Sequence, residues 1–336
     1  MRKLDVFTHI WPKPFYEALL RTTGQMRDMH RRSEAVPMMT NLDRRFQVMD
    51  LFEGYQQILS LASPAPDVAG TREAWRELAR IGTDSMAELC RKYPDRFPSF
   101  IASLPMRDPE GAVEEARRAV GDLGACGIQI YSNVAGKPLD APEFRPVFRE
   151  MERLGKPIWI HPARTAGFPD YPTEPRSLYE IWWTFGWPYE SSVAQARIVF
   201  SKMLDEMPGL KFIIHHAGGM VPFFEGRVGL GWDQLGTRTS DTDYRPLLKE
   251  LKKRPLDYFK LFYADTATFG SQSALVCALD FYGIDHLLFA SDAPFDPEGG
   301  PMYIRETIRA VEALELSTEG REKLYYKNAC QLLGIR

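Results

Sequence analysis

Eight short apolar runs, each followed by a longer amphipathic stretch, constrain the fold of this 336-residue chain most strongly. Several runs are continuously apolar, which is typical of parallel strands buried on both faces. The stretches between them carry apolar residues at helical spacing on one face and charges on the other. The runs are residues 3–7, 57–61, 97–103, 127–131, 157–161, 211–215, 261–264 and 286–290.

The clearest helical patterns lie between these runs, at residues 109–123, 141–154, 193–206 and 272–282. Eight strand–helix units in a chain of this length predict one α/β domain over residues 1–336, a closed (β/α)₈ TIM barrel. A doubly wound open sheet is the alternative, but no GxGxxG motif follows the first run.

Two connections are longer than a barrel needs, so we expect insertions after strands 1 and 5. The first is residues 11–50, and the second, residues 162–192, is rich in aromatic side chains. Long loops after strands lie on the catalytic face of such barrels. The aromatic insertion is either a lid or subunit contact, or it brings one or two rings, Trp187 among them, against a substrate.

The composition excludes several classes of protein. The formal net charge is −3, so no basic excess points to nucleic acid. The four cysteines form no CxxC pair, which disfavours a zinc ribbon or a disulfide framework. The acidic Asp5 stands where a signal peptide needs its apolar stretch. No apolar run approaches the ~18 residues of a membrane span. We therefore expect a soluble, cytoplasmic protein without membrane or nucleic-acid partners.

Polar residues follow or end several of the predicted strands. Because the carboxyl ends of barrel strands meet at one rim, four histidines and two aspartates are expected to converge there. They are His9, His161, His215, His216, Asp265 and Asp292. Imidazoles and carboxylates are the usual ligands of zinc and similar divalent ions, which lower the pKa of a bound water or polarise a substrate oxygen.

The motifs at these positions occur in a distinctive order: DVFTH at 5–9, IHP at 160–162, FGWPYE at 185–190, HAGG at 216–219 before Pro222, and SDAP at 291–294. Together they resemble the amidohydrolase-related (amidohydrolase 2) family. The likeness is strongest to its branch of aminocarboxymuconate-semialdehyde, resorcylate and hydroxybenzoate decarboxylases. The resemblance implies a TIM barrel of the metal-dependent hydrolase type.

The resemblance also implies a role for each residue. His9, His161 and Asp292 match the family's metal ligands, and the implied ion is zinc, with manganese as an alternative. His216 matches the histidine that serves as acid and base, with Asp292 beside it. His216 is preferred to His215 because the spacing to Pro222 fits the family motif from His216, which leaves His215 structural.

One residue departs from the family pattern. Phe7 stands where the family has the first histidine of a pair, or in some decarboxylases a glutamate. Phenylalanine offers no lone pair, so three protein ligands remain, which is still a normal number for a catalytic zinc site. The metal is therefore bound by the three residues, bound more weakly or as another ion, or lost.

Substrate-binding candidates come from the loops and strand ends. Arg45 and Arg164 are candidates to clamp a substrate carboxylate through paired hydrogen bonds. Tyr131, at the end of the fourth strand, and Trp187 are candidates to line the pocket. For Asp265, orienting a ligand and pairing with a neighbouring barrel group are both open. His30 is either solvated or reaches an anionic substrate.

These observations favour nonoxidative decarboxylation of a small aromatic or unsaturated carboxylic acid. In the mechanism implied by the family, His216 protonates the carbon that bears the carboxylate. One alternative is metal-dependent hydrolysis of a lactone, ester or amide, or hydration of an enol acid. Another is a metal-free or noncatalytic relative, because of Phe7. The resemblance implies a homodimer or higher homo-oligomer.

Overall fold

A ring of eight parallel strands forms the centre of the computed structural model, which describes residues 1–23 and 29–335. Each strand is bonded to the next in chain order, apart from a small separate pair, β5 (Asn133–Val134) and β6 (Lys137–Pro138). The strands of the ring are β1 (Lys3–Ile10), β2 (Tyr55–Leu61), β3 (Ser99–Ser103), β4 (Gly127–Tyr131), β7 (Ile158–His161), β8 (Phe212–Ile214), β9 (Tyr263–Asp265) and β10 (Leu287–Leu288).

Backbone hydrogen bonds between β1 and the chain around β10 close the ring. The amide of Val6 donates to the carbonyl of Phe289 at 2.9 Å, and the amide of His9 donates to the carbonyl of Ala293 at 2.8 Å. The predicted (β/α)₈ barrel is therefore confirmed, and all eight predicted runs overlap its strands.

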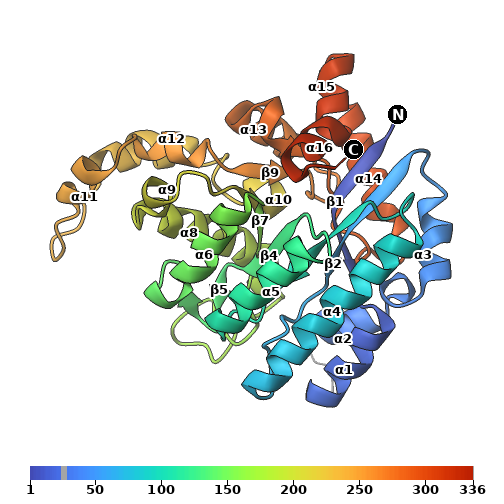
Figure 1. Ribbon diagram of the computed structural model, residues 1–336. Coiled ribbons are helices and arrows are strands. Elements are labelled where there is room, and N and C mark those ends of the chain that lie inside the picture. Colours follow the sequence, from blue (N-terminus) through green and yellow to red (C-terminus); the bar gives the residue numbers. More distant parts are fainter. Residues whose placement is uncertain (24–28, 336) are drawn as a thin grey trace.

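The described residues form helices, most of which surround the ring on its outside (Figure 1). They are α1 (Lys13–Thr23), α2 (Met29–Glu34), α3 (Leu42–Met49), α4 (Arg72–Lys92), α5 (Pro109–Gly121), α6 (Arg145–Leu154), α7 (Ile181–Thr184), α8 (Gly186–Phe200), α9 (Met203–Glu206), α10 (His215–Gly218), α11 (Arg245–Glu250), α12 (Pro255–Phe259), α13 (Gln272–Tyr282), α14 (Pro301–Glu312), α15 (Thr318–Glu322) and α16 (Asn328–Leu333).

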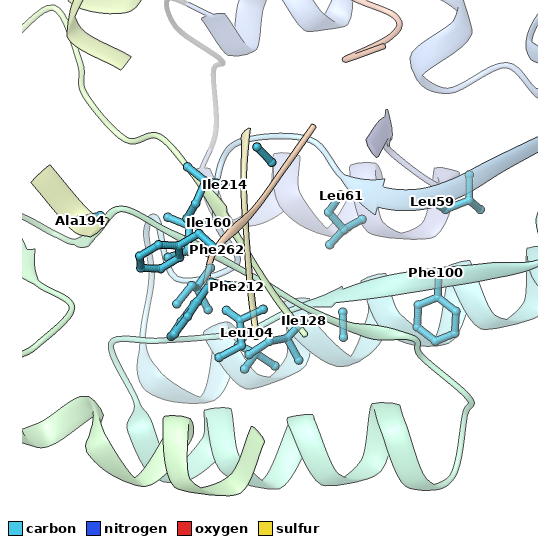
Figure 2. Close-up of a cluster of buried hydrophobic side chains, with 14 of the residues drawn as sticks. Leu59, Leu61, Phe100, Leu104, Ile128, Ile160, Ala194, Phe212, Ile214 and Phe262 are labelled. Atoms are coloured by element: carbon cyan, nitrogen blue, oxygen red, sulfur yellow. The ribbon is translucent and has the colours of Figure 1, made fainter. Parts of the chain in front are cut away.

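Two apolar cores hold the layers together. The larger one fills the space between strands and helices, and Figure 2 shows part of it, including Leu59, Ile128 and Phe212. The smaller one lies inside the ring and includes Leu4, Phe7, Trp159 and residues of α16, which therefore packs against the barrel interior. Burial of this apolar surface is the main favourable contribution to folding.

The predicted insertions occur after β1, with α1 to α3, and after β7, with α7 and α8. A third long connection, residues 219–262 between α10 and β9, was not predicted; it carries α11 and α12, which lie far from β1 in Figure 1. Its helices are short and interrupted, so they lack the sustained periodicity by which sequence patterns reveal a helix. No helix in the described part of the chain combines the length and apolarity needed to cross a bilayer.

Candidate functional site

The strand register brings the predicted rim residues to one end of the barrel. His9 of β1 is paired with Ser60 of β2, and His161 of β7 is paired with Tyr131 of β4. Both histidines are buried. The rings of His9 and His161 lie 5.7 Å apart between centroids, so two separate strands supply imidazoles to the same place.

Asp292 connects two histidines. His9 Nε2 lies 3.0 Å from Asp292 Oδ1, and His216 Nε2 lies 3.5 Å from Asp292 Oδ2. On the other side of its ring, His9 Nδ1 lies 3.3 Å from the hydroxyl of Ser60. The carboxylate of Asp292 therefore bridges the end of β1 and the segment that follows β8.

Left-handed backbone at three non-glycine residues shapes this rim. His216 has φ 58°, Ala217 has φ 56° and Asp292 has φ 62°. This conformation is uncommon for residues with a Cβ and is found preferentially where function fixes the backbone. At Gly218, which also has positive φ, a Cβ would lie 2.2 Å from the hydroxyl of Tyr282, so glycine is required there.

His215 and Asp265 form a buried pair behind this rim. His215 Nδ1 lies 2.6 Å from Asp265 Oδ2, and both side chains are fully buried. The other carboxylate oxygen of Asp265 accepts a hydrogen bond from the amide of Ala217 at 3.2 Å. Asp265 thus holds the turn that carries His216, and of the two alternatives from the sequence, pairing with a neighbouring group is the one observed.

The surroundings of Asp292, His216 and His161 shift the pKa values of these three residues in different directions. Burial alone would raise the pKa of Asp292 and lower that of His216. Hydrogen bonds and charges outweigh burial at both residues. His216 and His9 together hold the Asp292 pKa well below its usual value, and Asp292 raises the His216 pKa above 6.5. Burial and the neighbouring histidines hold the pKa of His161 well below 6.5. His216 is therefore suited to carry a proton, and His161 stays neutral.

Two cavities open onto these residues. A small one of about 30 Å³ is lined by His9, His161 and Asp292, together with Arg32 and several aromatic side chains. A larger one of about 410 Å³ extends beside it. Ser63, His161 and Trp187 line both cavities, so the two form adjoining compartments of one site.

Three of the four predicted substrate-binding residues reach the larger compartment: Tyr131, Arg164 and Trp187. Trp187 also lies nearly parallel to the ring of His216, with centroids 6.4 Å apart. Arg164 is paired with Glu190, with 3.3 Å between the guanidinium and the carboxylate.

The structure does not bring Arg45 to the site. Its side chain is fully buried beside β1, where it donates to the carbonyls of His9 and Met38 and to the side chain of Gln57. The orientation of α3 turns the Arg45 side chain toward β1. The sequence pattern around Arg44 and Arg45 does not reveal that orientation. Arg45 positions the backbone of His9 instead of binding a substrate.

Arg32 of α2 is one of the lining residues that the sequence analysis did not single out. It lines the small compartment together with Tyr303, and its guanidinium donates to the carbonyl of Phe295 at 2.5 Å. The run Met29-His30-Arg31-Arg32 was a visible basic signal in the first insertion. It identified only His30 as a candidate for anion binding, and His30 lines the larger compartment.

The donor chemistry of the small compartment fits a divalent metal. His9, His161 and Asp292 all line it. His161 Nδ1 donates to the carbonyl of Pro162 at 2.7 Å, which leaves the lone pair on Nε2, as in many metal-binding histidines. Within residues 1–23 and 29–335, however, no three His, Cys, Asp or Glu side chains are already close enough to enclose an ion. Phe7 packs against His9 at this level of the barrel, with centroids 4.3 Å apart.

Comparison with known proteins identifies the family. A family model described as amidohydrolase matches residues 5–335. The chain belongs to the amidohydrolase family. The family predicted from the sequence is therefore confirmed, and this amidohydrolase is similar over most of its length to named enzymes.

Gamma-resorcylate decarboxylase from Rhodococcus jostii (strain RHA1) is 32% identical over 309 residues, which cover 87% of each chain. The 2-amino-3-carboxymuconate-6-semialdehyde decarboxylase of Dictyostelium discoideum is 30% identical and covers 77% of this chain and 67% of its own. A solved structure of dihydroxybenzoic acid decarboxylase from Polaromonas sp. JS666, with bound manganese and the inhibitor 2-nitroresorcinol, aligns with a TM-score of 0.78 and 27% identity over 99% and 97% of the chains. These relatives show that this amidohydrolase is an enzyme.

Proposed function

We propose that this amidohydrolase is a nonoxidative decarboxylase of a small aromatic carboxylic acid. The observation that carries the proposal is the 3.5 Å contact between His216 Nε2 and Asp292 Oδ2, because it places a histidine next to a carboxylate that lines the same small compartment as Arg32. The decarboxylase relatives support the same reaction.

The proposed reaction needs one proton at one carbon. His216 donates its proton to the ring carbon that bears the carboxylate, and the bond between that carbon and the carboxylate then breaks. The electron pair of the broken bond restores the aromatic ring, and carbon dioxide leaves. Asp292 stabilises the imidazolium before transfer, and Arg32 binds a substrate oxygen by a charge-assisted hydrogen bond.

We infer that His9, His161 and Asp292 hold a divalent metal during this reaction. Such an ion supplies positive charge that orients the substrate's carboxylate and adjacent oxygen. The manganese in the Polaromonas relative supports a divalent ion, and zinc is the ion expected from the sequence. Neutral His161 suits either metal because it presents a free lone pair.

A substrate screen in heavy water tests the reaction. Hydroxybenzoates and muconate-like acids are incubated with the enzyme and scored for carbon dioxide, and the product is analysed by mass spectrometry. The expected product carries one deuterium at the position that lost the carboxylate. Hydrolysis of lactones or esters without any carbon dioxide release would establish the hydrolase alternative instead.

Dialysis against a chelator tests the metal. Activity is expected to fall and to return on addition of Mn²⁺ or Zn²⁺, and the ion that restores more activity is the better candidate cofactor. Unchanged activity at undetectable metal content would establish the metal-free alternative. The homodimer and the cytoplasmic location stay predictions.

A further inference from the structure

The sizes of the two compartments restrict how an aromatic acid fits. The small compartment, at about 30 Å³, has room for little more than one water molecule. An aromatic ring placed beside His9 and Asp292 therefore extends past His161 and Trp187 into the larger compartment. That compartment measures about 410 Å³, whereas a cavity of about 150 Å³ is enough for benzene. A single ring leaves more than half of it unfilled.

Most of the surface that lines the larger compartment is apolar. Leu104 and Met106 follow β3 and are buried, and Val68 comes from the loop after β2. Val134 and Trp182 line the same compartment. Apolar side chains of this kind favour a ligand group that leaves water, because burial of each additional methylene is favourable.

The two arginines of the larger compartment already have partners. The guanidinium of Arg164 lies 3.3 Å from Glu190 and 5.4 Å from the ring centroid of Phe168. The guanidinium of Arg107 donates to the carbonyl of Asp67 at 3.0 Å and lies 4.4 Å from the ring centroid of Trp75. A second negative charge on the ligand would have to compete with these contacts, so the lining favours a neutral group.

We propose that the substrate is an aromatic acid with a neutral, apolar substituent about as large as a second ring or a short alkyl chain. The substituent lies against Val68, Leu104 and Met106 in the larger compartment. This inference rests on the proposed decarboxylation, because that reaction places the carboxylate at the small compartment.

A homologous series of acids tests the proposal. The probes are 2-hydroxybenzoates that carry hydrogen, methyl, propyl, pentyl or phenyl at ring position 4 or 5. With the wild-type enzyme, kcat/KM is expected to rise roughly fourfold per buried methylene until the compartment is full. Calorimetry with the matching substituted phenols measures the same increments in binding without any need for turnover.

A pair of tryptophan variants locates the effect. Val68→Trp fills part of the larger compartment from a side chain that is 43% exposed. It is expected to abolish the gain from propyl, pentyl or phenyl, so that kcat/KM no longer rises with the size of the substituent. Val276→Trp makes the same change at a partly exposed position on α13, outside the residues that line the compartment, and is expected to keep the gain.

The outcomes distinguish this inference from the reaction itself. If the unsubstituted acid is decarboxylated best and longer substituents weaken binding, the inference is wrong and the decarboxylation stands. If the phenols bind more tightly with chain length but no acid of any length releases carbon dioxide, the apolar subsite stands and the reaction is wrong. Equal loss of the gain in the Val68 and Val276 variants would also overturn the inference.

Discussion

The ring of Phe7 stacks on the imidazole of His215, with centroids 3.3 Å apart and an angle of 21° between the planes. Both side chains are fully buried in the barrel, and His215 Nε2 has no hydrogen-bond partner among the described residues. Phe7 thus fills, by packing, the first-strand position at which the family resemblance places a metal ligand. The candidate metal ligands are therefore His9 on β1 and the side chains that end or follow other strands of the ring.

Phe7→His is expected to tighten Mn²⁺ binding at least tenfold, because it adds an imidazole next to His9. Without metal the variant should melt at a lower temperature than the wild type, since a buried polar group without a partner costs about 1–3 kcal/mol. Metal should restore the melting temperature, because it binds only the folded state.

Calorimetric titration with Mn²⁺ and thermal unfolding measure the two effects of this substitution. Phe7→Leu is the matched control, since it keeps an apolar side chain without a donor and should leave metal affinity unchanged. Equal Mn²⁺ affinity in the wild type and in Phe7→His would mean that the first-strand position does not face the ion.

His216→Asn should lower kcat by about 10²–10⁴-fold, the usual contribution of a general acid. Metal content should stay close to that of the wild type, because Asp292 keeps its contact with His9. Stopped-time assays of carbon dioxide release and elemental analysis give the two measurements. Loss of the metal together with activity would make His216 a ligand and not the proton donor.

The rate should fall on the alkaline side. The active form of His216 is protonated, and its pKa is raised above 6.5 because the hydrogen bond and charge of Asp292 outweigh burial. As pH rises through that raised value, kcat/KM is expected to decline tenfold per unit, whereas below it the rate is limited by other groups. Profiles from pH 6 to 9, with circular dichroism at each pH to confirm folding, measure the decline. A rate that increases steadily to pH 9 would point to a general base.

The strand ends could be predicted from the sequence because a barrel leaves them little freedom. Short apolar runs followed by His9, His161 and Asp292 put those residues on one rim, whatever the lengths of the loops. Arg45 and Arg32 could not be placed in the same way. Both lie in the insertion after β1, where the side to which a short helix turns depends on tertiary packing and not on local pattern.

Arg45→Met is expected to lower the free energy of unfolding by about 3 kcal/mol. The substitution leaves the carbonyl of His9, the carbonyl of Met38 and the side chain of Gln57 without their buried donor. Urea unfolding followed by fluorescence gives the value. Arg44→Met is the control at the adjacent, exposed position and should change stability by less than about 0.5 kcal/mol. A comparable loss in both variants would show that the buried hydrogen bonds of Arg45 contribute nothing specific.

Arg32→Gln should raise KM for the carboxylate substrate by about 10–100-fold, which corresponds to the loss of one charge-assisted hydrogen bond. Arg32 lines the compartment that holds His9 and Asp292, so its positive charge faces the reacting end of the acid. The substrate carries its negative charge in both the ground state and the transition state, so Arg32 stabilises both. For this reason kcat should change less than KM.

Steady-state kinetics with a hydroxybenzoate separate the two constants for Arg32→Gln. Arg31→Gln removes an exposed arginine from the same helix, outside the residues that line either compartment, and should leave KM within about twofold. Arg32→Lys keeps the charge but not the planar fork of donors and should recover part of the affinity. If kcat falls with KM unchanged, Arg32 acts on the transition state alone; if neither constant changes, Arg32 does not contact the substrate.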